Sequence, residues 1–479
     1  MPTSTARKRP ARSTAKAPRA FNPVPPASRT ATYEERIAAG KALRGRVPLE
    51  SHAEWNPGRD RHDPVTLVVA SSEGRIPELV PIRYGRMSAS PFTFYRGTAL
   101  NMAADLAHTP STGIETQVCG DCHLMNFGGF ATPERRVVFD INDFDETLPG
   151  PWEWDVKRLA ASFVHAARSN GFSVADERDV ALAAARSYRE RMRDYAKMRA
   201  LDVWYARIDT DAVIASLSDA ESAARFKKRL AKTAARNVPE ADFPKLVESS
   251  GGEHVIKDSP LLIYHDQEIN MRSEAADLDV ALAKYRETMQ EDRRVLLDRY
   301  HIVDFALKVV GVGSVGTFCA IILLMAQADD PMFLQVKEAR ASVLEPYVGK
   351  SVHPNHGQRI VTGQRLMQSA SDIFLGWTQG KRGRHFYLRQ LRDMKIKPLV
   401  EVFNRATMLD YANLCGWALA RAHARSGDAA MIAGYLGRKD TFERAIARFS
   451  RAYADQAERD YAAFMNAIRD GRIEAHVES

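Results

Sequence analysis

The chain contains 479 residues, of which 45% are hydrophobic and 27% charged, and it carries a formal net charge of +8 at pH 7. It has no run of about 18 apolar residues and no apolar segment near its N-terminus, so we expect neither a transmembrane helix nor a secretory signal. Four cysteines in so long a chain favour a reducing compartment, and we predict a cytoplasmic protein that does not bind membranes.

The positive charge is concentrated near the N-terminus. Residues 1–50 carry 11 Lys and Arg against 3 Asp and Glu, which accounts for the whole net charge. Residues 1–30 are rich in Ala, Pro, Ser, Thr and Arg and have little to bury, so we predict a disordered basic tail. The simplest interpretation is a solvated tail, and weak contact with nucleic acid or another polyanion is the alternative. Beyond this tail, nucleic acid is not an expected partner.

The next segment offers one candidate contact before the main motif. We predict a short helix over 33–43, a loop-rich stretch over 51–85 and a helix over 99–107. Arg96 lies between the last two, and it is either a contact for phosphate or carboxylate or part of a structural ion pair.

Two acidic strings follow each other between residues 119 and 145. In them, apolar residues alternate with Asp and Asn, as in Cys119-Gly120-Asp121-Cys122-His123-Leu124-Met125-Asn126 and Phe139-Asp140-Ile141-Asn142-Asp143-Phe144-Asp145. Ionised carboxylates near a core are costly unless they are paired or bound to metal. We predict a strand over 135–139 that delivers Asp140. Asp143 is a further metal ligand or a brace of the loop, and Asp145 is expected to be structural.

The string Cys119-x-x-Cys122-His123 also matches the attachment motif of a c-type haem. Such a haem normally requires export, and no export signal is present. A zinc site would need a second pair of ligands, and none has the required spacing. We therefore expect neither group here.

Helices dominate the middle of the chain. A helix is predicted from Asp155, a good N-cap, to Gly171, and the stretch 175–300 reads as mostly helical, with an excursion over 237–264. The sequence assigns no function to residues 171–300. We interpret Asp155 as structural.

A glycine-rich loop lies between two apolar, β-branched segments. Gly311, Gly313, Ser314 and Gly316 belong to a G-x-G-x-x-G string, and a third strand ends near Lys337. A dinucleotide fold would need a helix after the glycines and an acid at the end of the next strand. The chain instead has a strand and a lysine there. Backbone N–H groups of such a loop close over phosphates, and the lysine supplies a fixed positive charge.

The rest of this region is predicted as a helix over 358–370, strands over 372–379 and 385–391, a connecting segment over 392–397 and a helix over 399–426. A kinase lysine needs an acidic partner. Since the helix over 358–370 contains no acid, Glu345 is the candidate.

Together these segments resemble a protein-kinase-like phosphotransferase, and most of all the aminoglycoside- and choline-kinase branch. The resemblance implies that Asp121 is the catalytic base, that Asn126 and Asp140 hold magnesium, and that Lys337 and the glycine loop hold ATP. Because the catalytic loop precedes the glycine loop, the implied fold is circularly permuted. We expect an α+β protein with a helical lobe (31–300), a five-stranded lobe (301–397) and C-terminal helices (398–479) that complete the helical lobe.

Four strings also carry a resemblance to domain-of-unknown-function family 2252. They are Phe94-Tyr95-Arg96-Gly97, the string from Cys119 to Gly128, the string from Phe139 to Glu146, and Leu334-Gln335-Val336-Lys337-Glu338-Ala339. The chain is identified as a member of this family over about residues 80–425. The resemblance implies no activity.

Three functions remain open from the sequence. The first is an ATP- and magnesium-dependent phosphotransferase with an unknown hydroxyl acceptor, for which a small molecule is favoured, and a variant of the same site could transfer AMP. The second is a nucleotide-binding module without turnover. The third is a metal-dependent hydrolase that uses the Asp cluster. Neither the acceptor nor the oligomeric state follows from the sequence.

Overall fold

The computed structural model describes residues 28, 30–234, 243–250, 253–259, 262–265, 280–327, 330–391 and 395–477. Three predictions fall wholly or partly outside the described residues. They are the basic tail, of which only residues 28 and 30 are described, parts of the mostly helical stretch over 175–300 with its excursion over 237–264, and part of the connecting segment over 392–397.

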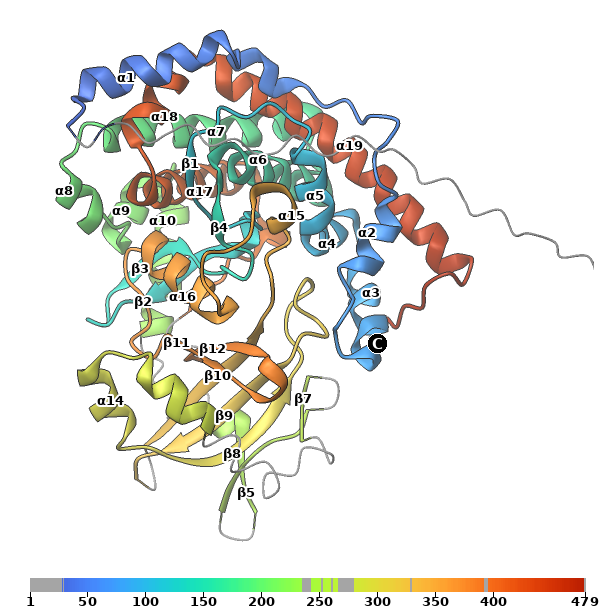
Figure 1. Ribbon diagram of the computed structural model, residues 1–479, viewed down its shortest axis with the longest axis vertical. Coiled ribbons are helices and arrows are strands. Elements are labelled where there is room, and N and C mark those ends of the chain that lie inside the picture. Colours follow the sequence, from blue (N-terminus) through green and yellow to red (C-terminus); the bar gives the residue numbers. More distant parts are fainter. Residues whose placement is uncertain are drawn as a thin grey trace, which may run out of the picture.

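The fold is mixed α+β, as predicted. Figure 1 shows most helices packed together at one end and a sheet at the other. The helices that precede the sheet are α1 (Tyr33–Ala42), α2 (Pro64–Ala70), α3 (Val80–Ser88), α4 (Pro91–Gly97), α5 (Ala99–Leu106), α6 (Trp152–Ser169), α7 (Val174–Tyr195), α8 (Ala200–Tyr205), α9 (Thr210–Ser216), α10 (Ala220–Ala234), α12 (Phe243–Leu246) and α14 (Glu291–Leu297). The later helices are α15 (Glu345–Val348), α16 (His356–Met367), α17 (Arg405–Ser426), α18 (Ala429–Leu436) and α19 (Thr441–Arg469).

The large sheet has six antiparallel strands in the order β11-β12-β10-β9-β8-β7. Its strands are β7 (Ile263–Tyr264), β8 (His301–Lys308), β9 (Cys319–Met325), β10 (Pro331–Ala339), β11 (Gly376–Gln379) and β12 (His385–Gln390). The five strands expected from the sequence are β8 to β12, and the short edge strand β7 is additional. The register places Lys337 on β10 opposite Cys319 on β9 and Tyr387 on β12.

Both faces of this sheet are covered, which explains the apolar sequence of its central strands. All seven residues of β9 are buried. Ile322 and Leu334 pack with residues near α14 on one face, whereas Ile321 and Phe333 pack with α12 and β6 on the other. Since successive side chains of a strand point to opposite faces, a strand covered on both sides must be apolar throughout.

Three pairs of short strands lie outside this sheet. They are built from β1 (Glu115–Val118), β2 (Phe127–Ala131), β3 (Val137–Ile141), β4 (Leu148–Pro151), β5 (Val247–Ser250) and β6 (Glu253–Ile256). The pairs are β1 with β4, β2 with β3, and β5 with β6. Along the chain, the first acidic string lies between β1 and β2, and the second begins in β3 and ends before β4. The first two strand pairs therefore fix the backbone on either side of each string.

Helix α6 begins at Trp152 rather than at Asp155, because Pro151 occupies the N-cap position. The predicted capping role of Asp155 is therefore corrected. It lies in the first turn, and α6 is buried along almost its whole length. A buried carboxylate needs a partner other than the helix terminus. Among the described residues, no helix has both the length and the apolar character that a membrane span requires.

Candidate active site

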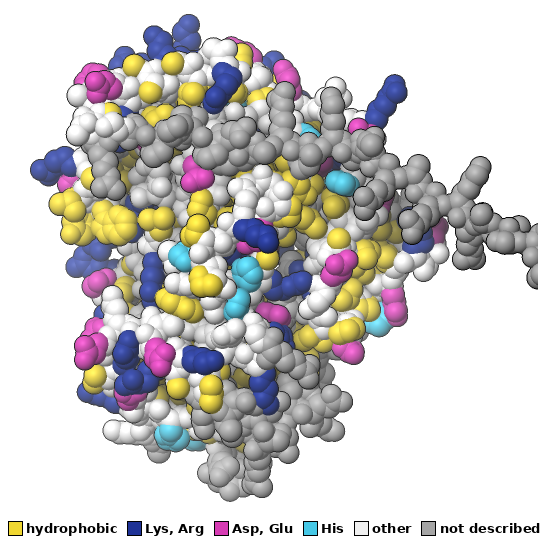
Figure 2. All heavy atoms as spheres, viewed as in Figure 1, with side chains coloured by type: hydrophobic (Ala, Val, Ile, Leu, Met, Phe, Trp, Pro, Cys, Tyr) yellow, Lys and Arg dark blue, Asp and Glu magenta, His cyan; other side chains and the backbone are white. Residues whose placement is uncertain are grey.

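A cavity of about 310 Å³ brings the acidic strings and the glycine loop together. Its walls include residues from three regions that are far apart in sequence, namely Arg75, Arg83 and Arg96, then Asp121, His123, Asn126, Asp143, Asp145 and Glu146, then Gly311, Gly313, Ser314 and Arg340. In the face shown in Figure 2, charged side chains and histidines gather across the middle, between the helices and the sheet. The cavity is the place where the two predicted halves of the site meet.

Helix α6 holds the loop that carries Asp121 through hydrogen bonds to its backbone. The carboxylate of Asp155 accepts hydrogen bonds from the backbone N–H of Cys119 at 2.7 Å and of Gly120 at 3.1 Å. Gly120 has a φ of +80°, and a Cβ at this position would lie 2.5 Å from the carbonyl oxygen of Glu146. Only glycine fits this turn, which directs the next side chain toward the cavity. Asp155 is structural, as predicted, and its partner is the loop.

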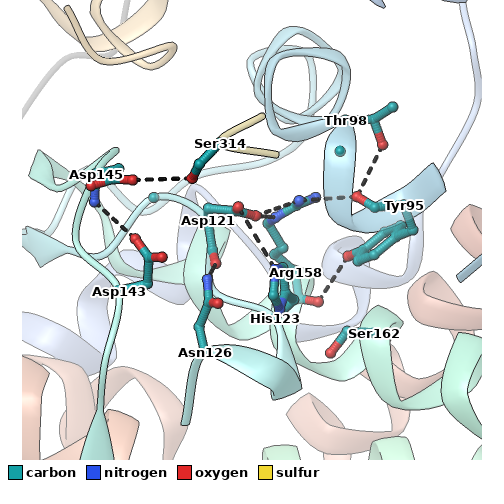
Figure 3. A network of polar contacts seen from close by, with 12 residues as sticks. Tyr95, Thr98, Asp121, His123, Asn126, Asp143, Asp145, Arg158, Ser162 and Ser314 are labelled. Carbon is teal, nitrogen blue, oxygen red and sulfur yellow. Dashed lines mark hydrogen bonds and ion pairs between the residues drawn. The ribbon is translucent and has the colours of Figure 1, made fainter. Parts of the chain in front are cut away.

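Asp121 projects from this loop toward Arg158 and His123 (Figure 3). Its Oδ1 accepts a hydrogen bond from Nε of Arg158 at 2.6 Å, and Nη2 of Arg158 also contacts this oxygen. Its Oδ2 lies 3.8 Å from Nε2 of His123, and 23% of the side chain is exposed. Burial raises the pKa of Asp121, although Arg158 opposes this effect. One carboxylate oxygen is thus fixed in place, and the other faces the cavity.

Asn126 and Asp143 add further oxygen atoms beside Asp121. The Asn126 amide N–H donates to the carbonyl oxygen of Asp121 at 2.8 Å, and Oδ1 of Asp143 accepts from the backbone N–H of Asp145 at 3.2 Å. Burial and the neighbouring Asp145 carboxylate raise the pKa of Asp143. Amide and carboxylate oxygens are the ligand type that Mg²⁺ prefers. Asn126 and Asp143 therefore offer the oxygen types that a magnesium ion takes, whereas both oxygens of Asp145 already accept hydrogen bonds.

Asp145 is the acidic partner of the sheet lysine. Nζ of Lys337 donates to Oδ2 of Asp145 at 2.6 Å, and the hydroxyl of Tyr387 donates to Oδ1 at 2.6 Å. Glu345, the predicted partner, instead lies 4.0 Å from Nδ1 of His356. This corrects the assignment of Glu345 and gives Asp145 a place in the site. Cross-strand pairing explains why Asp145 contacts both side chains, because Tyr387 and Lys337 are register partners that reach the same carboxylate.

Asp140 does not reach the cavity, which corrects its assignment as a metal ligand. It is fully buried, and both its oxygens accept hydrogen bonds from Nη2 of Arg421 on α17, at 2.7 and 2.8 Å. Its Oδ2 also accepts from the backbone N–H and the hydroxyl of Ser369, both at 2.9 Å. A carboxylate satisfied in this way has its lone pairs occupied. Asp143, two residues past the end of β3, lines the cavity in the place where Asp140 was expected.

The glycine loop closes the cavity from the side of the sheet. Gly311 and Gly316 have φ values of +71° and +83°, in the left-handed region that favours glycine. Nothing lies within 4 Å of a Cβ built on Gly311. The hydroxyl of Ser314 donates to Oδ2 of Asp145 at 3.4 Å, which links the loop to the acidic string. Gly311, Gly313 and Ser314 line the cavity, and Gly316 anchors the loop by accepting from the N–H of Ile76 at 2.7 Å.

Cys119 and Cys122 lie behind Asp121, with their sulfur atoms and a carboxylate oxygen of Asp155 all within 4.8 Å of one another. Burial raises the pKa of both thiols, which disfavours the thiolate form that metal binding requires. The Asp155 carboxylate already accepts from two backbone N–H groups and lies 3.3 Å from Nε2 of His423. These residues fit a brace for the loop better than a metal site.

The Lys337–Asp145 pair predicts an acid-sensitive contribution to stability. Burial alone would raise the pKa of Asp145, but Lys337 lowers it below its usual value. A carboxyl group whose pKa is lower in the folded state stabilises the fold at pH values above its unfolded pKa of about 3.9. This contribution is lost as the pH falls through the pKa of the folded state. We expect Asp145→Asn to lower the free energy of unfolding by about 1.5–3 kcal/mol at pH 7, the range for a hydrogen bond to a charged group.

Urea unfolding of wild type and Asp145→Asn over a pH series measures this effect. The difference between them should shrink as the pH falls below about 3.9. Asp143→Asn is the matched control, because the pKa of Asp143 is raised and its removal should cause no such acid-side loss. A difference for Asp145→Asn that does not change with pH would contradict the prediction.

Comparison with known families places the whole site in one sequence family. Residues 75–467 match the family described as "uncharacterized protein conserved in bacteria" (DUF2252). The chain belongs to this family. The DUF2252 region contains the acidic strings, the glycine loop and Lys337, so the cavity is built within it. No curated protein and no solved structure matches the chain.

Sequence reasoning missed Arg75, Arg83 and Arg340, which line the cavity of this DUF2252 protein, and also Arg158 and Tyr387, which contact its acids. Arg158 follows Asp155 by three positions on α6, so both face the same loop, and this spacing was a usable signal. Tyr387 gave no signal, because its contact with Asp145 depends on strand pairing.

Proposed function

We propose that this protein is an ATP- and magnesium-dependent phosphotransferase with a circularly permuted, kinase-like arrangement. The observation that carries the proposal is the meeting of the glycine loop with Asp121, Asn126, Asp143 and Asp145 around one cavity. The order of elements supports it as well. Strand β8, the glycine loop, β9, β10 with Lys337, helix α16 and strands β11 and β12 follow the order of a kinase nucleotide-binding half.

Each residue has a chemical role in this proposal. Asp121 would orient the acceptor hydroxyl and take its proton as the oxygen attacks the terminal phosphorus, while the bond from that phosphorus to the bridging oxygen breaks and ADP leaves. Asn126 and Asp143 would hold magnesium, which neutralises charge on the phosphates when bound, while Asp145 would hold Lys337 in place. The N–H groups of the glycine loop and the ammonium of Lys337 would fix the phosphates in place. In this arrangement Asp143 takes the metal-binding role that the sequence suggested for Asp140.

A nucleotide-binding module without turnover is the second candidate. The Arg158 side chain favours it, because it occupies Oδ1 of Asp121 and stabilises the charged carboxylate. A general base bound in this way is weaker. The two candidates share the same nucleotide site and differ in whether phosphate is transferred.

A thermal-shift titration tests the shared site. We expect Mg²⁺ with ATP to raise the melting temperature, and Mg²⁺ alone to have little effect, because a kinase-like site binds magnesium mainly through the phosphates. Release of ADP in the presence of candidate acceptors then separates turnover from binding. Stabilisation by metal alone, with no effect of ATP, would overturn the proposal in favour of a metal-dependent hydrolase.

A further inference from the structure

The cavity is lined by arginines as well as carboxylates. The arginines are Arg75, Arg83, Arg96 and Arg340, and three of them come from the segment around α2, α3 and α4. The loop that carries Asp121 and the residues after β3 supply the acids. Positive side chains in a cavity favour a ligand that carries negative charge.

Three of these arginines are held by the protein itself. Arg83 donates to the hydroxyls of Ser71 and Ser72 and to the carbonyl oxygen of Gly97. Arg75 donates to the carbonyl oxygens of Ser71 and Val315, and Arg340 donates to that of Glu73. All of these acceptors are neutral. The three side chains therefore line the cavity in fixed positions and add positive charge to it.

Arg96 differs from the other three. Within the described part of the chain its guanidinium has no hydrogen bond or salt bridge, and its buried Nε has no partner. The Cζ atom of Arg96 lies 5.9 Å from the centroid of the Phe92 ring. Among the described residues, Arg96 thus does not form the structural ion pair that the sequence left open for it. A partly buried guanidinium without an acceptor is costly, and an acceptor from outside the chain would remove that cost.

The position of Arg96 shows where such an acceptor would lie. Its carbonyl oxygen is 3.4 Å from the point where a Cβ of Gly313 would be, so its backbone adjoins the glycine loop. Arg96 and Asp121 both line the cavity. Burial lowers the pKa of Arg96, and the charges of Asp121 and Glu401 partly offset this effect. An acceptor bound by Arg96 would therefore lie in the cavity that the glycine loop and the candidate base also line.

We propose that Arg96 binds an oxyanion, either phosphate or carboxylate, in the cavity beside Asp121. The planar fork of arginine matches both groups. This inference rests on the proposed function. The oxyanion belongs to the acceptor, which is then a small hydroxyl compound with a phosphate or carboxylate group near the reacting oxygen. The terminal phosphate of the nucleotide is the other source with the same chemistry.

Calorimetric titration of the full-length protein with inorganic phosphate, without nucleotide, tests the site. We expect wild type to bind phosphate and Arg96→Gln to bind it about tenfold more weakly or worse, with Arg96→Lys intermediate because it keeps the charge but loses the fork. Arg444→Gln is the control, since Arg444 is an exposed residue paired with Asp440. Arg96 contributes no hydrogen bond to the fold, so its variants should unfold at the wild-type temperature.

Repeating the titration with saturating Mg-ADP and with a non-hydrolysable Mg-ATP analogue identifies the source. Phosphate that binds in both cases assigns Arg96 to the acceptor, whereas phosphate that is excluded only by the ATP analogue assigns it to the terminal phosphate. Equal phosphate affinity in wild type and Arg96→Gln, or no phosphate binding by wild type, would overturn the inference. Since the first titration contains no nucleotide, its result is independent of whether Mg-ATP stabilises the protein.

Discussion

Asp143→Asn should abolish the magnesium-dependent part of ATP binding while leaving the protein folded. Asp143 lines the cavity beside Asn126, and its Oδ1 accepts a single backbone hydrogen bond. Asparagine keeps the size and one acceptor oxygen but removes the charge that holds the metal. Because burial and Asp145 raise the pKa of Asp143, loss of this charge should not weaken the fold. We expect the extra thermal stabilisation by Mg²⁺ over ATP alone to disappear, a loss of several kcal/mol of metal-dependent interaction.

Asp121→Asn provides the contrast in the same cavity. If Asp121 is the base and not a metal ligand, this variant should keep magnesium-dependent ATP binding and lose turnover by about 10²–10⁴-fold. Thermal shift with and without Mg²⁺ measures binding, and ADP release measures turnover. If Asp143→Asn kept the full magnesium effect, or if Asp121→Asn lost it, the division of roles between the two carboxylates would be incorrect.

Arg421→Met should cause the largest loss of stability. Arg421 and Asp140 are both fully buried, and the pair joins α17 to the end of β3 through two short hydrogen bonds. Nη2 of Arg421 also donates to the carbonyl oxygen of Met367, the last residue of α16. Removal of the arginine leaves a buried, unpaired carboxylate, and we expect the free energy of unfolding to fall by about 3–5 kcal/mol.

Denaturant unfolding of a double-mutant cycle tests this expectation. The double variant Arg421→Met with Asp140→Leu removes both charges, so it should be markedly more stable than Arg421→Met alone. A cost of less than about 1 kcal/mol for the single variant, the range of an exposed pair, would contradict the burial of the pair. The site should still bind Mg-ATP in the double variant, because Asp140 lies outside the cavity.

Local patterns in the sequence were sufficient to predict the elements of the sheet. Strands β8, β9, β10 and β12, the glycine loop between the first two, and helix α16 all lie within a few residues of where periodicity and glycine placed them. These signals depend on neighbours in the chain. The assignment of the whole chain to one family also followed from strings of adjacent residues.

Local sequence patterns were not sufficient to predict the partners of charged residues. Two residues separate Asp140 from Asp143 and one separates Asp143 from Asp145. This spacing alone does not tell which carboxylate faces a cavity and which one faces Arg421. The choice of Glu345 for Lys337 failed because Asp145 reaches the lysine from a different part of the chain. Such pairings depend on which segments pack together.

The sequence by itself thus determined the mixed α+β class, the order of the elements and the residues able to do chemistry, since each follows from composition, periodicity or adjacency. Only the tertiary structure decided that the glycine loop and the acidic strings share one cavity, that Asp140 is an internal brace, and that Arg96 has no polar partner among the described residues. The physical reason is that the energy of a buried charge is set by what surrounds it in space. Those surroundings are fixed only when strands pair and helices pack.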